Sequence, residues 1–220
     1  MLPNKIPEHL DVDIKSIPEE RANMISHGLG LILFLIAVPI LTYYTVSTGV
    51  TEYWIGSLLF GISLIMVYMA STLYHSSYNA NFRRKFKIFD HVSIYFLIAG
   101  SYSPFILTHL NTVSGWSIFI VLWSMVLIGS IVKLWFVDQF KLISTLAYLV
   151  MGWLVLFIIK PLFLALPALS FAMIVVGGVF YTVGVYFYLN KKLKFNHLIW
   201  HLFVLGGSVS HFIAVFLCLD

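Results

Sequence analysis

Two histidines, His197 and His201, lie four residues apart at the start of the last hydrophobic stretch of the chain. On an α-helix this spacing places both imidazole rings on the same face. Two such rings can bind one metal ion if a third ligand comes from another segment. The motif lacks the glutamate of the H-E-x-x-H metalloproteases, because Leu198 stands in its place. A catalytic base would therefore have to come from a different helix.

The composition of the chain places these histidines in a membrane. Hydrophobic residues make up 60% of the 220 residues and charged residues only 10%, whereas soluble domains carry about 25% charged residues. A soluble fold of this composition would expose large apolar patches to water. The single cysteine, Cys218, excludes a disulfide within one chain and a cysteine-based zinc site. We therefore predict a multi-pass protein of the cell membrane, with the lipid bilayer as its partner and no role in nucleic acid binding.

Seven apolar stretches follow a polar N-terminal tail, residues 1–23. Each is long enough to cross the bilayer as an α-helix, and none has a charge at its centre. None alternates as the strands of a membrane β-barrel do. We therefore predict an all-α fold, a seven-transmembrane-helix bundle over residues 24–220, with the tail forming either a short surface helix around Asp13–Ile17 or a flexible segment. The expected spans are Met24–Thr45, Tyr53–Tyr74, Phe89–Thr108, Trp116–Val137, Leu142–Lys160, Ala168–Leu189 and His197–Leu219.

Basic residues are concentrated in every second connection between these spans. The first-to-second and third-to-fourth connections carry no lysine or arginine, and the fifth-to-sixth has only Lys160. Because basic loops stay in the cytoplasm, we predict a cytoplasmic N-terminus and an outer C-terminus, the reverse of a G-protein-coupled receptor. The residues that carry this bias are Arg83, Arg84, Lys85, Lys87, Lys133, Lys141, Lys191, Lys192 and Lys194.

This orientation brings several polar side chains to the cytoplasmic end of the membrane. His75 ends the second span, Asp90 begins the third, and His197 and His201 lie in the first turns of the seventh. Ionisable groups are costly inside a bilayer, so their convergence from three helices indicates a functional site. The simplest assembly is one metal ion bound by His75, His197 and His201.

Three neutral imidazoles suit Zn²⁺ and leave a fourth coordination position open, which is typical of catalytic zinc. A zinc ion held in this way generates a hydroxide nucleophile near neutral pH. Asp90 could serve as the general base, since Asp138 lies in a loop and Glu52 on the far side of the membrane. Ser71, one turn before His75 on the same face, could donate to a developing oxyanion or orient a ligand.

The remaining histidines have simpler interpretations. A single interfacial histidine more often anchors a helix at head-group level than binds a metal, although this explanation is weaker for a converging set. We expect His91, which points elsewhere on its helix than Asp90, to be structural, and likewise His109 and His211. Two roles are open for His27. It could contact a metal ligand without binding the metal itself, or it could pack against or cap a helix.

Four segments link the chain to a known family. They are Glu20-Arg-Ala-Asn23-Met-Ile-Ser26-His27, Ser71-Thr-Leu-Tyr-His75, Phe89-Asp90-His91 with Gly100-Ser-Tyr-Ser-Pro104, and His197-Leu-Ile-Trp-His201-Leu-Phe-Val. With them the chain resembles the hemolysin III group of the progestin and adipoQ receptor family, whose wider superfamily includes alkaline ceramidases. The resemblance implies a bacterial plasma-membrane protein with a cytoplasmic N-terminus. It also implies zinc bound by one histidine of the second helix and two of the seventh, with an aspartate of the third contacting zinc through water. These positions fall on His75, His197, His201 and Asp90, and the motif serine falls on Ser71.

Two functions follow from these observations. The first is a zinc-dependent hydrolase of amide or ester bonds in a lipid substrate, because a site near the cytoplasmic leaflet is accessible to acyl chains and the ceramidase resemblance implies the same chemistry. The second is non-catalytic, either a receptor-like sensor with structural zinc or the cytolytic activity after which the bacterial group is named. The substrate and the oligomeric state are not predicted by the sequence.

Overall fold

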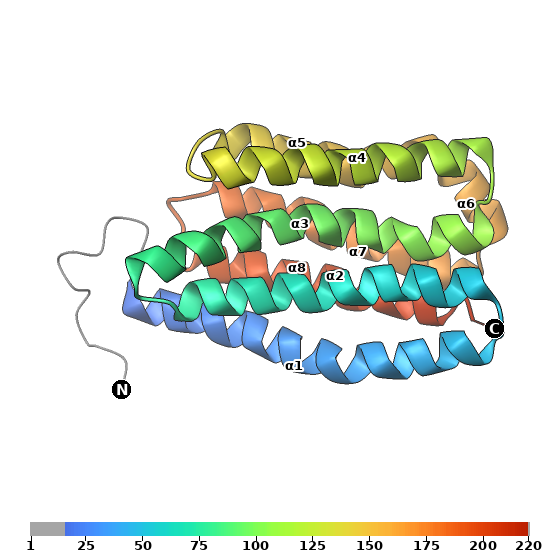
Figure 1. The fold of residues 1–220 in the computed structure, drawn as a ribbon, viewed down its shortest axis with the longest axis horizontal. Coiled ribbons are helices and arrows are strands. Elements are labelled where there is room, and N and C mark those ends of the chain that lie inside the picture. Colours follow the sequence, from blue (N-terminus) through green and yellow to red (C-terminus); the bar gives the residue numbers. More distant parts are fainter. Residues whose placement is uncertain (1–15, 220) are drawn as a thin grey trace.

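The computed structural model describes residues 16–219, and all regular structure within them is helical (Figure 1). Six helices are long and apolar enough to cross a membrane: α1 (Ile17–Ser47), α2 (Thr51–Ser76), α3 (Ala80–His109), α4 (Val113–Phe136), α7 (Ala168–Leu189) and α8 (Asn196–Phe216). Between α4 and α7 the chain forms α5 (Lys141–Trp153), the short 3-10 helix η1 (Leu154–Phe157) and α6 (Ile159–Ala165). These pieces bend by 60° and together form either a broken seventh span or a re-entrant loop. The predicted all-α bundle is therefore confirmed.

The helices run side by side, so that their ends form two opposite faces of the bundle (Figure 1). At one face α1 begins, α2 ends, α3 begins, α4 ends, α5 begins, α7 ends and α8 begins. Every lysine and arginine in residues 16–219 except Lys160 lies at or near this face, which we call the basic end. Its location in the cytoplasm stays a prediction of the positive-inside rule. Of the surface helix suggested around Asp13–Ile17, residues 13–15 lie outside the described residues, while Ser16 and Ile17 are the N-cap and the first residue of α1.

Helices α1 and α3 each begin about two turns before the apolar stretch that hydropathy identifies. The reason is local capping. The Ser16 side chain accepts a hydrogen bond from the Glu19 backbone N–H, and the Asn79 side chain accepts one from Phe82. Such caps satisfy the first free N–H groups of a helix. The extra turns are polar, yet they place Glu20 inside the bundle rather than in a tail.

The fifth predicted span, Leu142–Lys160, is not one continuous helix and reaches further than predicted. Pro161 has no N–H to bond the carbonyl of Phe157, four residues earlier, and its ring would clash with that carbonyl in a continuous helix, so the helix is interrupted just ahead of α6. The hydroxyl of Tyr102 on α3 accepts a hydrogen bond from the Val155 N–H at 3.0 Å and donates to the Gly152 carbonyl at 2.5 Å. The irregular backbone therefore finds its partners inside the protein, as it must at membrane depth.

Replacing Tyr102 by phenylalanine is expected to lower the thermal unfolding midpoint in detergent by about 3–6 °C. Two backbone groups at the break would lose their partner, at a cost of roughly 1–2 kcal/mol. Tyr43→Phe is the matched control, because the Tyr43 side chain is 70% exposed on the lipid-facing surface and should melt with the wild type. If Tyr102→Phe also melts with the wild type, contacts other than this hydroxyl stabilise the break.

Closely packed helix pairs, α2 with α3, α7 with α8 and α1 with α2, form most of the bundle. Phe34, Phe60, Leu64 and Tyr68 fill its centre and are almost fully buried. The α2 and α3 backbones approach so closely that a Cβ at Gly56 would lie 2.7 Å from the Pro104 Cα, which is the role expected of small residues in membrane bundles. By contrast, α5 meets few residues of α7. The histidines therefore lie on closely packed helices, and the cavity borders the side where α5 and α7 make little contact.

Candidate metal centre

Three histidines converge at the basic end of the bundle. His75 lies at the end of α2, and His197 and His201 lie in the first turns of α8. One ligand nitrogen of each lies within 4.8 Å of those of the other two, and the His75 ring centroid is 5.1 Å from both other rings. His75 and His201 are buried, while His197 is half-buried. The structure thus brings together the three residues that the sequence predicted as metal ligands.

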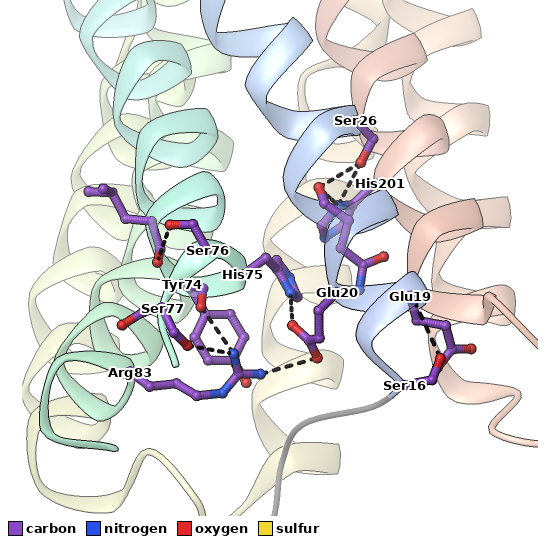
Figure 2. Close-up of polar contacts among 12 residues, drawn as sticks. Ser16, Glu19, Glu20, Ser26, Tyr74, His75, Ser76, Ser77, Arg83 and His201 are labelled. Carbon is purple, nitrogen blue, oxygen red and sulfur yellow. Dashed lines mark hydrogen bonds and ion pairs between the residues drawn. The ribbon is translucent and has the colours of Figure 1, made fainter. Parts of the chain in front are cut away.

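The His75 ring is oriented by a carboxylate. Its Nδ1 lies 2.8 Å from Oε2 of Glu20 (Figure 2), so Nδ1–H donates and Nε2 keeps its lone pair. That Nε2 atom is buried and has no hydrogen-bond partner among the described residues. A carboxylate behind one ring nitrogen and a metal ion on the other is the usual arrangement of metal-binding histidines.

The His201 ring is oriented by α1 in the same way. Its Nδ1 lies 3.2 Å from the Asn23 carbonyl oxygen and 3.1 Å from the Ser26 hydroxyl (Figure 2). Since the Ser26 hydroxyl itself donates to the Asn23 carbonyl, Nδ1–H of His201 is the donor in this group. The Nε2 atom is then the nitrogen with a lone pair, and two of the three histidines have their tautomer set by α1.

The start of α8 is also tied to α1. Phe195, directly before α8, has a left-handed backbone conformation with φ 55°, which is uncommon for a bulky residue. Its N–H donates to Oε1 of Glu19 at 2.9 Å. Strained backbone persists where surrounding contacts hold it. This contact fixes the turn that presents His197, two residues later.

Glu20 is only 1% exposed, and both of its carboxylate oxygens are paired. Oε2 faces His75, and Oε1 lies 3.2 Å from Nη2 of Arg83 (Figure 2). The Arg83 guanidinium stacks 4.4 Å from the Tyr74 ring centroid and donates to the Tyr74 carbonyl. A buried charge is tolerated only when it is paired and hydrogen-bonded. Glu20 therefore links His75, a candidate metal ligand, to the guanidinium group of Arg83.

Sequence reasoning missed the supporting roles of Glu20, Asn23 and Ser26 because it placed the first two in the polar tail, residues 1–23, and gave the third no role within the first span. A signal was present in their spacing, since positions three and six residues after Glu20 share one face of a helix. The other signal was a carboxylate within a segment that matched a family motif. Hydropathy does not identify these first turns of α1 as buried, because their polar side chains are buried against other polar groups.

Asp90 faces the same site from α3. Its carboxyl group interacts with His75, His91 and Lys87 and lies beside the Ser71 hydroxyl. The Ser71 Oγ is buried and forms no hydrogen bond of ordinary geometry with the described residues. Asp90 is not part of the group of ligand atoms within 4.8 Å of one another. This placement fits a carboxylate that acts beside a metal ion rather than binding it directly.

The other histidines occupy distinct surroundings. The His27 ring stacks on His201 with centroids 3.6 Å apart, and both of its nitrogens are buried without a partner in the described residues. His27 therefore supports a ligand ring from behind. His91 contacts a carbonyl of its own helix, His109 packs against an α2 aromatic ring, and His211 contacts an α7 carbonyl. These contacts fit the structural interpretation of the last three.

A cavity of about 680 Å³ extends from the histidines into the bundle. His75, Asp90 and Ser71 line one end, and deeper walls are apolar, with Phe105 of α3 and Phe171 of α7. Drug-sized ligands occupy cavities of about 300–1,000 Å³ that combine apolar walls with a few polar groups. The cavity therefore has the volume and the polarity gradient to hold an amphiphile.

The cavity is open on the side where α5 and α7 make little contact. Val175, Val179 and Val183 lie along one face of α7 and line the cavity, yet they remain between 40% and 57% exposed. On the facing side, Trp153 and Leu156 combine the same two properties. This indicates that the cavity opens between α5–η1 and α7, at a depth where a membrane protein meets lipid.

A sequence profile described as "Haemolysin-III related" matches residues 15–212. The chain belongs to the haemolysin III family. Hemolysin-3 of Bacillus cereus is 42% identical over 199 residues, which cover 90% of this chain and 91% of that protein. The Hemolysin-3 homolog of Bacillus subtilis (strain 168) is 41% identical over 200 residues, covering 91% and 94%. The human Monocyte to macrophage differentiation factor is 26% identical over 204 residues, covering 90% and 83%.

Membership of the haemolysin III family confirms the resemblance carried by the four sequence segments, and the relatives agree with a multi-pass protein of the cell membrane. In this haemolysin III family chain the donor set also fits Zn²⁺. It consists of three imidazoles without a thiolate, and two of them have one nitrogen already hydrogen-bonded. The buried Nε2 of His75 would gain the partner that it lacks among residues 16–219.

Proposed function

We propose that this protein is a zinc-dependent hydrolase that cleaves an amide or ester bond in a membrane lipid. The observation that carries the proposal is the position of the three histidines at the polar end of a cavity whose other walls are mainly apolar. This combination suits a substrate with a polar reacting group and a long hydrocarbon chain.

His75, His197 and His201 would hold the ion, which when bound supplies Lewis acidity and an activated water near neutral pH. Asp90 would accept the proton of the attacking water on its carboxylate and return it to the leaving amine or alcohol. The Ser71 hydroxyl would donate a hydrogen bond to the oxyanion that develops on the substrate carbonyl. The polar contacts of Glu20 and Asn23 keep the ligand rings in one orientation.

The apolar walls would bind the acyl chain and keep bulk water from the reacting carbonyl. The exposed valines of α7 support entry of the chain from the bilayer, without passage of the hydrocarbon through water. Binding of the acyl chain would set the position of the substrate carbonyl relative to Asp90 and Ser71. Such orientation of the reacting groups is a large part of enzymatic rate enhancement.

Two non-catalytic functions are the alternatives. A receptor-like sensor would use the same cavity with structural zinc, and the buried Glu20–Arg83 pair, which makes the site rigid, favours it. A cytolytic function is favoured by the printed names of the two Bacillus relatives. A lytic protein that inserts from solution must hide its apolar surface in water, however, and most helices in residues 16–219 expose large apolar side chains.

The test is metal content together with turnover. We expect the protein purified in detergent to contain about one equivalent of zinc by elemental analysis, since three histidines define one site. Incubation with ceramides and other acyl lipids should release free fatty acid, and a chelator should stop the release until zinc is restored.

Each other outcome of this experiment has a definite meaning. Much less than one equivalent of zinc in the untreated protein would contradict the metal site. Full zinc without fatty acid from any lipid would favour the sensor. Leakage of vesicles without fatty acid release would favour the cytolytic function.

A further inference from the structure

A second polar group lies deep in the cavity, away from the histidines of the candidate metal centre. It consists of Tyr181 on α7 and His211 on α8, which both line the cavity. Their ring centroids are 5.4 Å apart, and the rings meet edge to face. The walls around them are mainly apolar, with Ile174 of α7 and Val204 of α8 among their residues. Ionisable side chains are costly within a membrane-spanning bundle and usually have a function there.

The positions of these residues along α8 give the depth of the pair. Ser208, whose hydroxyl shares a hydrogen bond with that of Tyr181, lies seven residues after His201, and His211 lies ten residues after it. From the rise of an α-helix, the Tyr181 hydroxyl is therefore about 10 Å, and His211 about 15 Å, deeper in the bundle than His201. The cavity thus presents the candidate metal centre, then an apolar stretch, then a second polar position.

One ring nitrogen of His211 has a partner and the other does not. Nε2 lies 3.2 Å from the Ile174 carbonyl oxygen. Because a carbonyl only accepts, Nε2–H donates, and Nδ1 of the neutral ring keeps a lone pair. A Cβ at Gly177 would overlap the ring, so close packing against α7 holds the ring in place. Nδ1 is buried and has no hydrogen-bond partner in residues 16–219, which is costly for a polar atom at this depth.

The Tyr181 hydroxyl can supply the matching donor. It lies 3.0 Å from the Ser208 hydroxyl, and either group can donate in this pair. When Ser208 donates, the O–H of Tyr181 is left to donate to a second acceptor. Among the described residues no hydrogen bond joins Tyr181 to His211, although their rings are in contact. An alcohol group, which accepts one hydrogen bond and donates another, would complete a chain from Ser208 through Tyr181 to His211.

We propose that the cavity takes an acyl chain that carries a hydroxyl group near its middle. The hydroxyl accepts a hydrogen bond from Tyr181 and donates one to Nδ1 of His211. Because Nδ1 is buried at the cavity wall, the hydroxyl reaches it as the neighbouring Tyr181 ring shifts. An extended hydrocarbon chain covers roughly 10–15 Å in about 8–12 carbon–carbon bonds, which places the hydroxyl near the tenth carbon. The inference rests on the proposed function only for the position of the acyl carbonyl at the histidines.

Two positional isomers of a hydroxylated fatty acid test the proposal without turnover. The mid-chain isomer is stearate with a hydroxyl on its tenth carbon, which can reach Tyr181 and His211. The near isomer has the hydroxyl on its third carbon, close to the carboxylate, and the same composition and charge. By calorimetry in a neutral detergent, we expect the purified protein to bind the mid-chain isomer about tenfold more tightly, because it makes two hydrogen bonds that the near isomer cannot make.

Single substitutions assign the preference to this pair of side chains. Tyr181→Phe removes the donor and should bring the two isomers to within about twofold of each other. Unsubstituted stearate should bind to this variant as tightly as to the wild type, which shows that the variant is folded. His211→Leu removes the acceptor and should have the same effect. Tyr186→Phe makes the matched change on α7 at a side chain that is 64% exposed and lies outside the cavity lining, and it should keep the wild-type preference.

Three results would overturn the proposal. Equal binding of the two isomers by the wild type would assign Nδ1 of His211 to a bound water molecule. A preference that persists in Tyr181→Phe would place the hydroxyl elsewhere in the cavity. A preference lost equally in Tyr186→Phe would show that the effect does not come from the cavity. Because the probes are not cleaved, absence of lipid hydrolysis in the earlier experiment leaves this one intact, and failure here leaves hydrolysis of lipids without a chain hydroxyl as a separate question.

Discussion

Replacing Asp90 by asparagine is expected to reduce lipid turnover by about 10²–10⁴-fold, the usual contribution of a general acid–base group, while zinc content stays close to that of the wild type. The carboxylate lies beside Ser71 and His75 but outside the group of close ligand atoms. Asparagine has nearly the same shape and can still hydrogen-bond, so the cavity should keep its form. It cannot accept a proton, so only the chemical step is affected.

His197→Ala provides the comparison for this prediction, because loss of one of three ligands should remove both zinc and turnover. His109→Ala is a control for the loss of a histidine elsewhere, since His109 lies at the opposite end of α3 and packs against Tyr53. Zinc by elemental analysis and fatty acid release are measured on the same preparations. If Asp90→Asn loses as much zinc as His75→Ala, Asp90 is a direct ligand and its assignment as base is wrong.

Replacing Glu20 by glutamine is expected to weaken both the fold and the metal site. Removing one partner of a buried ion pair leaves the other charge uncompensated, which costs about 3–5 kcal/mol, and Arg83 is the charge left behind here. The loss of the carboxylate behind His75 should also reduce zinc affinity by about 10–100-fold. Thermal unfolding in detergent and competition with a zinc chelator measure the two effects.

A second substitution separates these effects of Glu20. Adding Arg83→Met to Glu20→Gln removes the cation that has lost this carboxylate and should restore much of the stability, but the zinc affinity should stay low because His75 still lacks its carboxylate. Glu52→Gln is the matched control, since Glu52 is exposed at the other end of the bundle. A Glu20→Gln protein with wild-type zinc affinity would show that the carboxylate does not orient the ligand.

The fold was predictable because length and hydropathy decide which segments can cross a bilayer, and the structure has six such helices and one bent pair. The convergence of His75, His197 and His201 was predictable for a related reason. Alternate basic connections fix the direction of each span, and direction places the end of α2 beside the start of α8.

Two features depend on contacts between distant segments and were not predicted from the sequence, although the motif and the spacing around Glu20 carried a partial signal. The break before α6 is stabilised by a hydroxyl from α3, and nothing near Tyr102 in the chain indicates this contact. The role of Glu20 depends on burial against His75 and Arg83, whereas its local sequence is that of a polar tail. When polar side chains are buried by pairing with one another, the hydropathy of the sequence does not indicate that they are buried.

The contact between Ser26 and His201 joins residues 175 positions apart in the chain. During synthesis α1 enters the membrane long before α8 exists. The polar groups of α1 that contact His201 therefore lack this partner until α8 has been made. The histidine cluster is then complete only when the last helix docks against the first. Zinc uptake by the newly made chain should therefore mark the final step of assembly, and a chain that ends before α8 should have all the other helices but no zinc.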